Sequence, residues 1–127
     1  MKLSLFILSF FLFSCSELKT SESITARWEF ISINDGKNSE VDSKMLNNTK
    51  RENGTGTLEF NNDLSFSSLG SKNNSKGSYI LKNGILTMQY SDLPEPIKFN
   101  YSVVEDKYLL LTNTEGKPLT WLYKKSK

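Results

Sequence analysis

Few side chains of this sequence are able to do chemistry, and the first of them is Cys15. It is the only cysteine in the 127 residues, and the sequence contains no histidine. Without an imidazole, neither a Ser-His pair nor a histidine-ligated metal site can be assembled. A cysteine nucleophile requires that Cys15 keep a free thiol. The composition therefore predicts no metal and no cofactor.

Paired carboxylates are the remaining candidates for acid–base chemistry. Asp92 lies near Glu95, and Glu105 is followed directly by Asp106. Both pairs lie in segments with turn composition, where solvated acidic residues are common. We interpret them as exposed turn residues and predict a protein without catalytic residues, that is, not an enzyme.

The segment before Cys15 has the composition of an export signal. Lys2 supplies a positive charge, and nine of the eleven residues from 3 to 13 are apolar. This run is too short to cross a bilayer, which takes about 20 residues of helix. We expect residues 1–14 to be a signal peptide.

The residues around Cys15 resemble the lipobox of bacterial lipoproteins. Leu12 and the small Ser14 precede the cysteine at the spacing of that motif, while Phe13 is bulkier than the family usually carries. In that family the thiol receives diacylglycerol, the leader is cut before it, and the new amine is acylated. The resemblance implies lipidation of Cys15 with palmitate-like chains, and two or three chains anchor a protein stably. An ordinary secretory signal with a coincidental cysteine, or a retained membrane anchor, are the alternatives.

The chain after the leader suits one anchored domain. Removing residues 1–14 leaves 113 residues with 15 basic and 14 acidic side chains, a balance that argues against nucleic acid as a partner. We expect residues 15–23 to be a lipidated cysteine with a flexible tether, and residues 24–127 to form a single domain. We expect the protein in the cell envelope, at the outer membrane, with the membrane as its partner through the acyl chains on Cys15.

Eight short segments with hydrophobic alternation of period two predict β-strands. In the first of them Ala26, Trp28 and Phe30 share one face. Asn83-Gly84 between two such segments is a strong hairpin signal, because both central residues of a type I′ turn need positive φ. The predicted strands are residues 24–33, 57–60, 64–69, 76–81, 85–90, 96–104, 107–112 and 119–125.

Tight turns between these segments predict an all-β, antiparallel up-and-down meander of about eight strands. Closing the meander into a barrel removes two bare edges. We therefore expect strand 24–33 to pair with strand 119–125, with Trp28 and Trp121 at the same end of the core. A two-sheet sandwich is the alternative, although its crossovers need longer connections.

Residues 34–55 form the one long connection. Asp42 or Ser43 is expected to cap a helical turn that carries Met45 and Leu46. Long loops in compact domains are often lids or binding loops, and the other interpretation is a surface excursion without function.

Segments across the mature chain resemble the small lipocalin-like domains of bacterial envelope lipoproteins. Lipocalins begin with Gly-x-Trp and pack that tryptophan beside a cation from the final strand. Ala26 replaces the glycine, Trp28 matches the tryptophan, and Lys124 or Lys125 would supply the cation. The resemblance implies a lipocalin-like barrel and transfers no ligand. It is carried by residues 26–30, 56–60 with Asp63, 77–80, 108–111 and 121–125.

Five aromatic residues are candidate ligand contacts: Trp28, Phe30, Phe99, Tyr101 and Trp121. An eight-stranded barrel is just wide enough for its own side chains or for one small ligand, so these residues could equally fill a core. Two functions stay open. One is a carrier of a small apolar molecule in a shallow mouth beneath loop 34–55. The other is an envelope protein-interaction or inhibitor module with a filled barrel.

Overall fold

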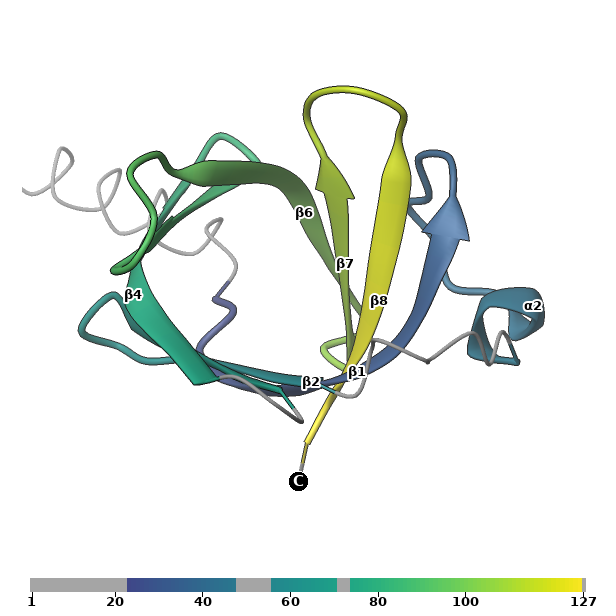
Figure 1. The fold of residues 1–127 in the computed structure, drawn as a ribbon. Coiled ribbons are helices and arrows are strands. Elements are labelled where there is room, and N and C mark those ends of the chain that lie inside the picture. The colour runs from purple at the N-terminus through teal and green to yellow at the C-terminus, as the bar shows by residue number, and fades with distance from the viewer. Residues whose placement is uncertain (1–22, 48–55, 71–73, 127) are drawn as a thin grey trace, which may run out of the picture.

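The computed structural model describes residues 23–47, 56–70 and 74–126. In these residues eight strands form one closed antiparallel barrel, each strand hydrogen-bonded to the next in sequence order (Figure 1). The strands are β1 (Ala26–Asp35), β2 (Gly56–Phe60), β3 (Ser65–Gly70), β4 (Asn74–Lys82), β5 (Ile85–Tyr90), β6 (Ile97–Val104), β7 (Tyr108–Asn113) and β8 (Leu119–Lys125). The predicted all-β, up-and-down barrel is confirmed.

The barrel closes through an antiparallel ladder between β1 and β8, as predicted. Its register places Trp28 opposite Lys125 and Ile33 opposite Trp121. The expectation that Trp28 and Trp121 lie at the same end of the core is therefore wrong. In an antiparallel pair the beginning of one strand meets the end of the other, and both tryptophans lie near the beginning of their strands.

The two ends of the barrel differ, and we name them after these two tryptophans. At the Trp28 end lie the start of β1, the end of β8 and the short turns at 61–64, 83–84 and 105–107. At the Trp121 end lie the described loop 36–47 and the connections at 91–96 and 114–118. Short turns thus close one end, and longer connections surround the other.

Turn chemistry accounts for two of the short turns. Asn83 (φ 53°) and Gly84 (φ 79°) both adopt the left-handed conformation that a type I′ hairpin requires. Glu105 (φ 54°) and Asp106 (φ 53°) do the same without a glycine. These hairpins match the right-handed twist of the strands, which the meander needs in order to curl and close.

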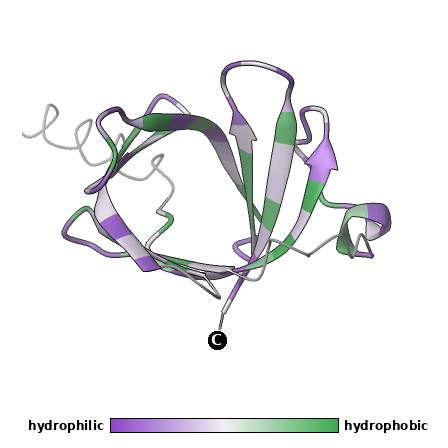
Figure 2. Cartoon of the chain, in the orientation of Figure 1, coloured by the Kyte–Doolittle hydropathy of each residue, from purple (hydrophilic) through white to green (hydrophobic). Residues whose placement is uncertain are grey.

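Apolar side chains fill the middle of the barrel. Figure 2 shows hydrophobic bands along β6 and β8 separated by more polar residues, as strands with one buried face require. At the centre Trp28 is fully buried, its Nε1–H donates to the carbonyl oxygen of Ile24 (2.9 Å), and Lys125 Nζ lies 5.5 Å from its ring centroid. Lys125 is thus the cation beside this tryptophan. The buried cluster comprises Ile24, Trp28, Leu58, Phe60, Phe66, Tyr79, Leu86, Met88, Leu109 and Leu111.

A β-bulge in β1 interrupts the alternation expected over residues 24–33. Phe30 lies opposite Tyr123 and Ser32 opposite Leu122, so Ile31 is the extra residue. Before the bulge the even-numbered residues Trp28 and Phe30 face inward, and after it the odd-numbered Ile33 does. Ile33 lies opposite Trp121 in the ladder.

A second apolar cluster lies on the outer face of the barrel, beneath α2 (Ser43–Leu46). Figure 1 shows α2 outside the ring of strands, beside β1. Met45 of α2 is buried against Leu110 of β7 and Leu122 of β8. Ser32 Oγ–H donates to the carbonyl oxygen of Met45 at 2.9 Å. The described part of segment 34–55 therefore covers the side of the barrel.

The predicted helical turn is confirmed. The Asp42 carboxylate accepts a hydrogen bond from the Met45 backbone N–H at 2.9 Å, which is the N-cap geometry. Met45 is buried, whereas its neighbour Leu46 is 40% exposed.

We predict that Met45→Ala lowers the free energy of unfolding by about 2–3 kcal/mol, because it removes the buried side chain that packs α2 against the barrel. Leu46→Ala, next to it on the exposed side, is the matched control and should cost less than about 1 kcal/mol. Urea denaturation followed by circular dichroism measures both. Equal losses for the two variants would contradict a stabilising role for the cover.

Leu64 is strained and offers a second test. Its φ is 71°, a conformation that costs a bulky residue about 1–2 kcal/mol, yet its side chain is 53% exposed. Leu64→Asn should therefore raise the free energy of unfolding by up to about 1 kcal/mol, since Asn tolerates positive φ. Leu93→Asn, at an exposed position outside the positive-φ residues, should change it by less than about 0.5 kcal/mol. A loss of stability in Leu64→Asn would show that the leucine side chain makes a needed contact.

Candidate functional site

Small side chains form one wall of the barrel interior toward the Trp121 end. Leu58, buried in the core, pairs with Ser68, and Ser68 pairs in turn with Ser75. Gly56 pairs with Gly70 two residues further out. Because directly opposite residues share a face of the sheet, the described residues of β2, β3 and β4 beyond Leu58 present Gly and Ser to the interior.

Gly77 continues this wall and brings two strands together closely. A Cβ at Gly77 would overlap the backbone carbonyl oxygen of Gln89 and press against the Phe66 ring. Tyr90 lies opposite Gly77 in the ladder, and its ring meets that of Phe66 edge-on, with centroids 4.9 Å apart. An aromatic ring thus lies beside the glycine, and no side chain but hydrogen fits at position 77.

Aromatic side chains form the facing wall. Phe30 of β1 meets Tyr123 of β8 edge-on with ring centroids 5.7 Å apart, and Phe99 of β6 meets Trp121 of β8 in the same way at 5.8 Å. These four inward residues keep some exposed surface, whereas the core residues in the middle are buried. The described residues therefore cover these rings less completely than the side chains in the middle of the barrel. We call these four residues with Tyr90 the aromatic mouth.

Two tyrosine hydroxyls lie in the aromatic mouth. Burial raises the pKa of Tyr123 well above its ordinary value, and nearby Tyr90 raises it further. Burial also raises the pKa of Tyr90; a hydrogen bond with the Ser68 hydroxyl offsets part of this, and the charge of Asp92 adds to it. Both phenols are therefore neutral near pH 7, and each O–H is available as a donor.

The Tyr123 hydroxyl differs from that of Tyr90 in having no partner. Among the described residues none forms a hydrogen bond with it. No buried side-chain nitrogen or oxygen of the described residues lacks a hydrogen-bond partner, so this hydroxyl keeps contact with solvent and can donate to water or to an incoming acceptor. This hydroxyl is the one polar feature of the aromatic mouth suited to orienting a ligand.

The five aromatic residues predicted to contact a ligand do not all come together. Phe30, Phe99 and Trp121 lie in the aromatic mouth. Trp28 has no exposed surface and belongs to the core, and Tyr101 lines a groove at the Trp28 end.

Sequence reasoning missed Tyr90 and Tyr123. Each lies two residues from an inward residue of its own strand, Met88 and Trp121, so the period of two was a usable signal. The register that brings Tyr90 of β5 and Tyr123 of β8 near each other is a tertiary feature.

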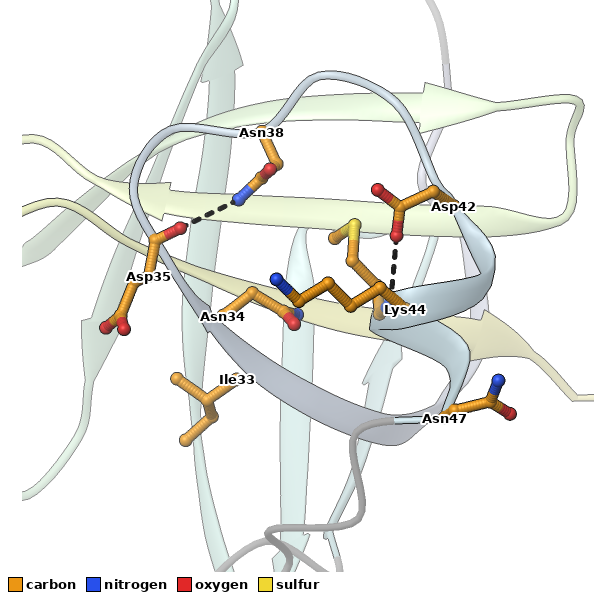
Figure 3. A pocket seen from close by; sticks show the side chains of 8 residues that line it. Ile33, Asn34, Asp35, Asn38, Asp42, Lys44 and Asn47 are labelled. Carbon is orange, nitrogen blue, oxygen red and sulfur yellow. Dashed lines mark hydrogen bonds between the residues drawn. The ribbon is translucent and has the colours of Figure 1, made fainter.

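A separate pocket of about 870 Å³ lies beside α2 (Figure 3). Figure 3 shows polar side chains on both sides of it, with Asn34, Asp35 and Asn38 from the end of β1 and its loop, and Asp42 and Lys44 from the α2 side. Several of these groups are already bonded within the protein: Asn38 Nδ2 donates to the Asp35 carbonyl oxygen at 3.2 Å, and Asp42 caps α2. Ile33 and Met45 also line the pocket, so its surface is mixed and most of its lining side chains are polar.

The carboxylate pairs considered above lie in turns, as predicted. Asp106 forms an exposed ion pair with Lys125 (2.8 Å), and Asp92 lies in the connection after β5. Elsewhere, hydrogen bonds from the Ser65 side chain and backbone lower the pKa of Asp63. No group of three or more His, Cys, Asp or Glu side chains that could hold a metal ion occurs in the described ranges. Cys15, with the lipobox and the tether, lies outside the described residues.

Comparison with known proteins extends only to the fold. No family model matches the chain, and no curated protein matches it. Among solved structures the chain is similar to the crystal structure of a DUF4847 family protein from Bacteroides vulgatus, with a TM-score of 0.57 over 81% of this chain and 94% of that chain. The two sequences are 12% identical, so the similarity shows a shared fold alone. In the described part of the chain, no helix is long and apolar enough to span a bilayer.

The unpartnered hydroxyl predicts an unusual response to mutation. Tyr123→Phe should change the free energy of unfolding by less than about 0.5 kcal/mol, because none of the described residues forms a hydrogen bond with this hydroxyl. Tyr79→Phe is the matched control: the Tyr79 hydroxyl donates to the Asn61 carbonyl oxygen at 2.8 Å, and its loss should cost about 1 kcal/mol. Chemical denaturation of both variants measures the difference. A loss at Tyr123 as large as that at Tyr79 would mean that its hydroxyl has a partner in the folded protein.

Proposed function

We propose that this protein is a lipid-anchored, non-enzymatic barrel of the bacterial cell envelope that binds one small, largely apolar ligand in its aromatic mouth. Acyl chains on Cys15 attach it to the outer membrane, and residues 15–23 tether the barrel to them. The ligand lies against the aromatic rings and presents a hydrogen-bond acceptor to the Tyr123 hydroxyl.

The observation that carries the binding proposal is the contrast between the middle of the barrel and its Trp121 end. Core residues such as Leu109 and Leu111 are at most 1% exposed, whereas Phe30, Trp121 and Tyr123 face inward yet remain partly accessible. The described residues opposite these rings are Gly and Ser, whose side chains take up little space. A shallow apolar site with one convergent polar group is the usual form of a small-molecule site.

The absence of catalysis is proposed from the residue inventory. The sequence has no histidine, and the proposed acylation removes the only thiol. The hydroxyls of the aromatic mouth have raised pKa values, which makes them donors and poor bases. These groups supply binding contacts and no activated nucleophile.

A second candidate function is an envelope protein-interaction or inhibitor module. It is favoured by the filled middle of the barrel and by three exposed hydrophobic residues around the Trp121 end, Leu69, Leu93 and Ile97. Charged substitution of Leu93, such as Leu93→Asp, would abolish capture of a partner through this rim and leave binding of a small ligand at the Tyr123 hydroxyl intact.

Lipidation is tested on the full chain in its host cell. Cys15→Ala should take up no labelled fatty acid and should leave the membrane fraction, because no other residue offers the acyl acceptor of the lipobox. Cys15→Ser removes the thiol with a smaller change in shape and should behave in the same way. Acyl labelling that persists in both variants would overturn the anchor.

Ligand binding is tested with decanoic acid and tryptophan fluorescence. We expect saturable quenching or enhancement from Trp121, which Trp121→Phe abolishes although Trp28 is still present. Tyr123→Phe should weaken binding about 3- to 10-fold, the effect of one hydrogen bond. Native mass spectrometry of protein taken from its own membrane gives the mass of any retained ligand. Absence of saturable binding together with an empty native protein would reject the carrier function and leave the interaction module.

A further inference from the structure

The described chain begins at the Trp28 end of the barrel and is held there. Ile24 is 1% exposed, and its carbonyl oxygen accepts the hydrogen bond from Trp28 Nε1. The Thr25 backbone N–H donates to Ser23 Oγ at 3.1 Å. Any segment that precedes Ser23 must therefore depart from this end, whatever path it then takes.

A groove of about 780 Å³ lies at this same end and includes the chain entry. Ser23, Ile24 and Thr25 form one side of it, and the turns after β2 and β4 contribute to the other. Its lining also contains Leu64 and Ile80, which are 53% and 58% exposed, the largest values among the exposed large hydrophobic residues described. The chain entry thus lies beside two apolar side chains that project into solvent.

Leu64 is an unexpected residue for its position. A turn residue at φ 71° is ordinarily Gly, Asn or Asp, and a bulky apolar residue there is a steric outlier. The backbone is fixed in this conformation by hydrogen bonds from Leu64 N–H to the Asn61 carbonyl oxygen (3.1 Å) and from Tyr79 N–H to the Leu64 carbonyl oxygen (2.9 Å). A strained backbone that displays an apolar side chain to solvent indicates a use for that side chain outside the fold.

The charge of the groove suits an anionic, partly apolar surface. Among the described residues that line it, Lys82 is the one charged residue and none is a carboxylate. The pocket beside α2, by contrast, is lined by Asp35 and Asp42. Asp63 precedes Leu64 in the sequence, and its carboxylate accepts hydrogen bonds from Ser65. Bacterial lipid surfaces combine anionic headgroups with an apolar layer. Lys82 beside the exposed Leu64 and Ile80 is complementary to both, although Glu105 and Asp106 also lie at this end.

From these observations we propose that the Trp28 end faces the membrane, with Leu64 and Ile80 inserted into the lipid headgroup region. This orientation rests on the proposed anchor at Cys15. Cys15 lies eight residues before Ser23, and eight residues of extended chain span at most roughly 29 Å. The tether therefore holds the groove close to the bilayer that contains the acyl chains.

The orientation has a consequence for the ligand. The aromatic mouth lies at the opposite end of the barrel, since Trp28 and Trp121 occupy different ends of the β1–β8 ladder. A ligand therefore enters from the aqueous side, and the membrane surface does not cover the mouth.

Depth-dependent quenching tests this orientation on the acylated full-length protein. Acylation leaves Cys15 without a thiol, so one introduced cysteine can be labelled alone with a small fluorophore. Leu64→Cys and Ile80→Cys place the label in the groove; Leu93→Cys and Leu46→Cys, 44% and 40% exposed, are the matched controls away from it. The proteins are reconstituted into vesicles of phosphatidylethanolamine and phosphatidylglycerol that contain a lipid with a nitroxide near its headgroup.

We expect quenching at positions 64 and 80 to be at least about threefold stronger than at positions 46 and 93, because only residues at the interface come within about 10 Å of the nitroxide. Equal quenching at all four positions, or stronger quenching at position 93, would overturn the orientation while co-flotation with the vesicles upholds the anchor. A protein that carries no acyl chain and does not float would overturn the anchor and the orientation together.

Discussion

The ladder between β1 and β8 is the contact on which the rest of the structure depends. It joins residues almost a hundred positions apart, such as Trp28 and Lys125, and it pairs the two edges that an open meander would leave bare. The same pairing brings Lys125 to the ring of Trp28 and lets the Ser126 N–H donate to the Arg27 carbonyl oxygen at 2.8 Å. Closure therefore completes both the sheet and the core, and it costs loop entropy because the two strands are far apart in the sequence.

Closure also limits the interior. Eight strands enclose a space only just wide enough for side chains, and ten buried apolar residues occupy its middle. A ligand site can therefore lie only toward an end, where the outermost side chains are no longer covered. Short turns and Ile24 close the Trp28 end, while Phe30, Trp121 and Tyr123 remain accessible at the other. The difference between the two ends gives each end a separate proposed role, ligand entry at one and membrane contact at the other.

The outer face of the barrel is used unevenly. A bulge at Ile31 adds a residue to β1 and places Ser32 where its hydroxyl meets the carbonyl oxygen of Met45. Leu110 and Leu122, which point away from the interior, are buried by α2 and not by the main core. The described part of the long connection after β1 is therefore a packed cover for one side of the sheet. This explains why β7 and β8 carry more apolar residues than strands that have one face buried and the other exposed to water.

Much of the fold was predictable from the sequence because its causes are local. Period-two alternation located all eight strands, Asn83-Gly84 identified a hairpin, and Asp42 marked the cap of α2. The composition, with no histidine and one cysteine, already excluded histidine-based catalysis and histidine-ligated metal sites. Within the candidate site, Phe30, Phe99 and Trp121 were predicted from their inward parity.

Only the tertiary structure decided which of these residues meet. The register of β1 with β8 separates Trp28 from Trp121, and a register is set by the packing of both strands together and by neither alone. The burial of Tyr123 and its unpartnered hydroxyl depend on strands distant in sequence, as does the groove that Leu64 and Ile80 share with Ser23. Periodicity states which side of a strand is apolar, whereas the neighbours across the barrel determine what that side touches.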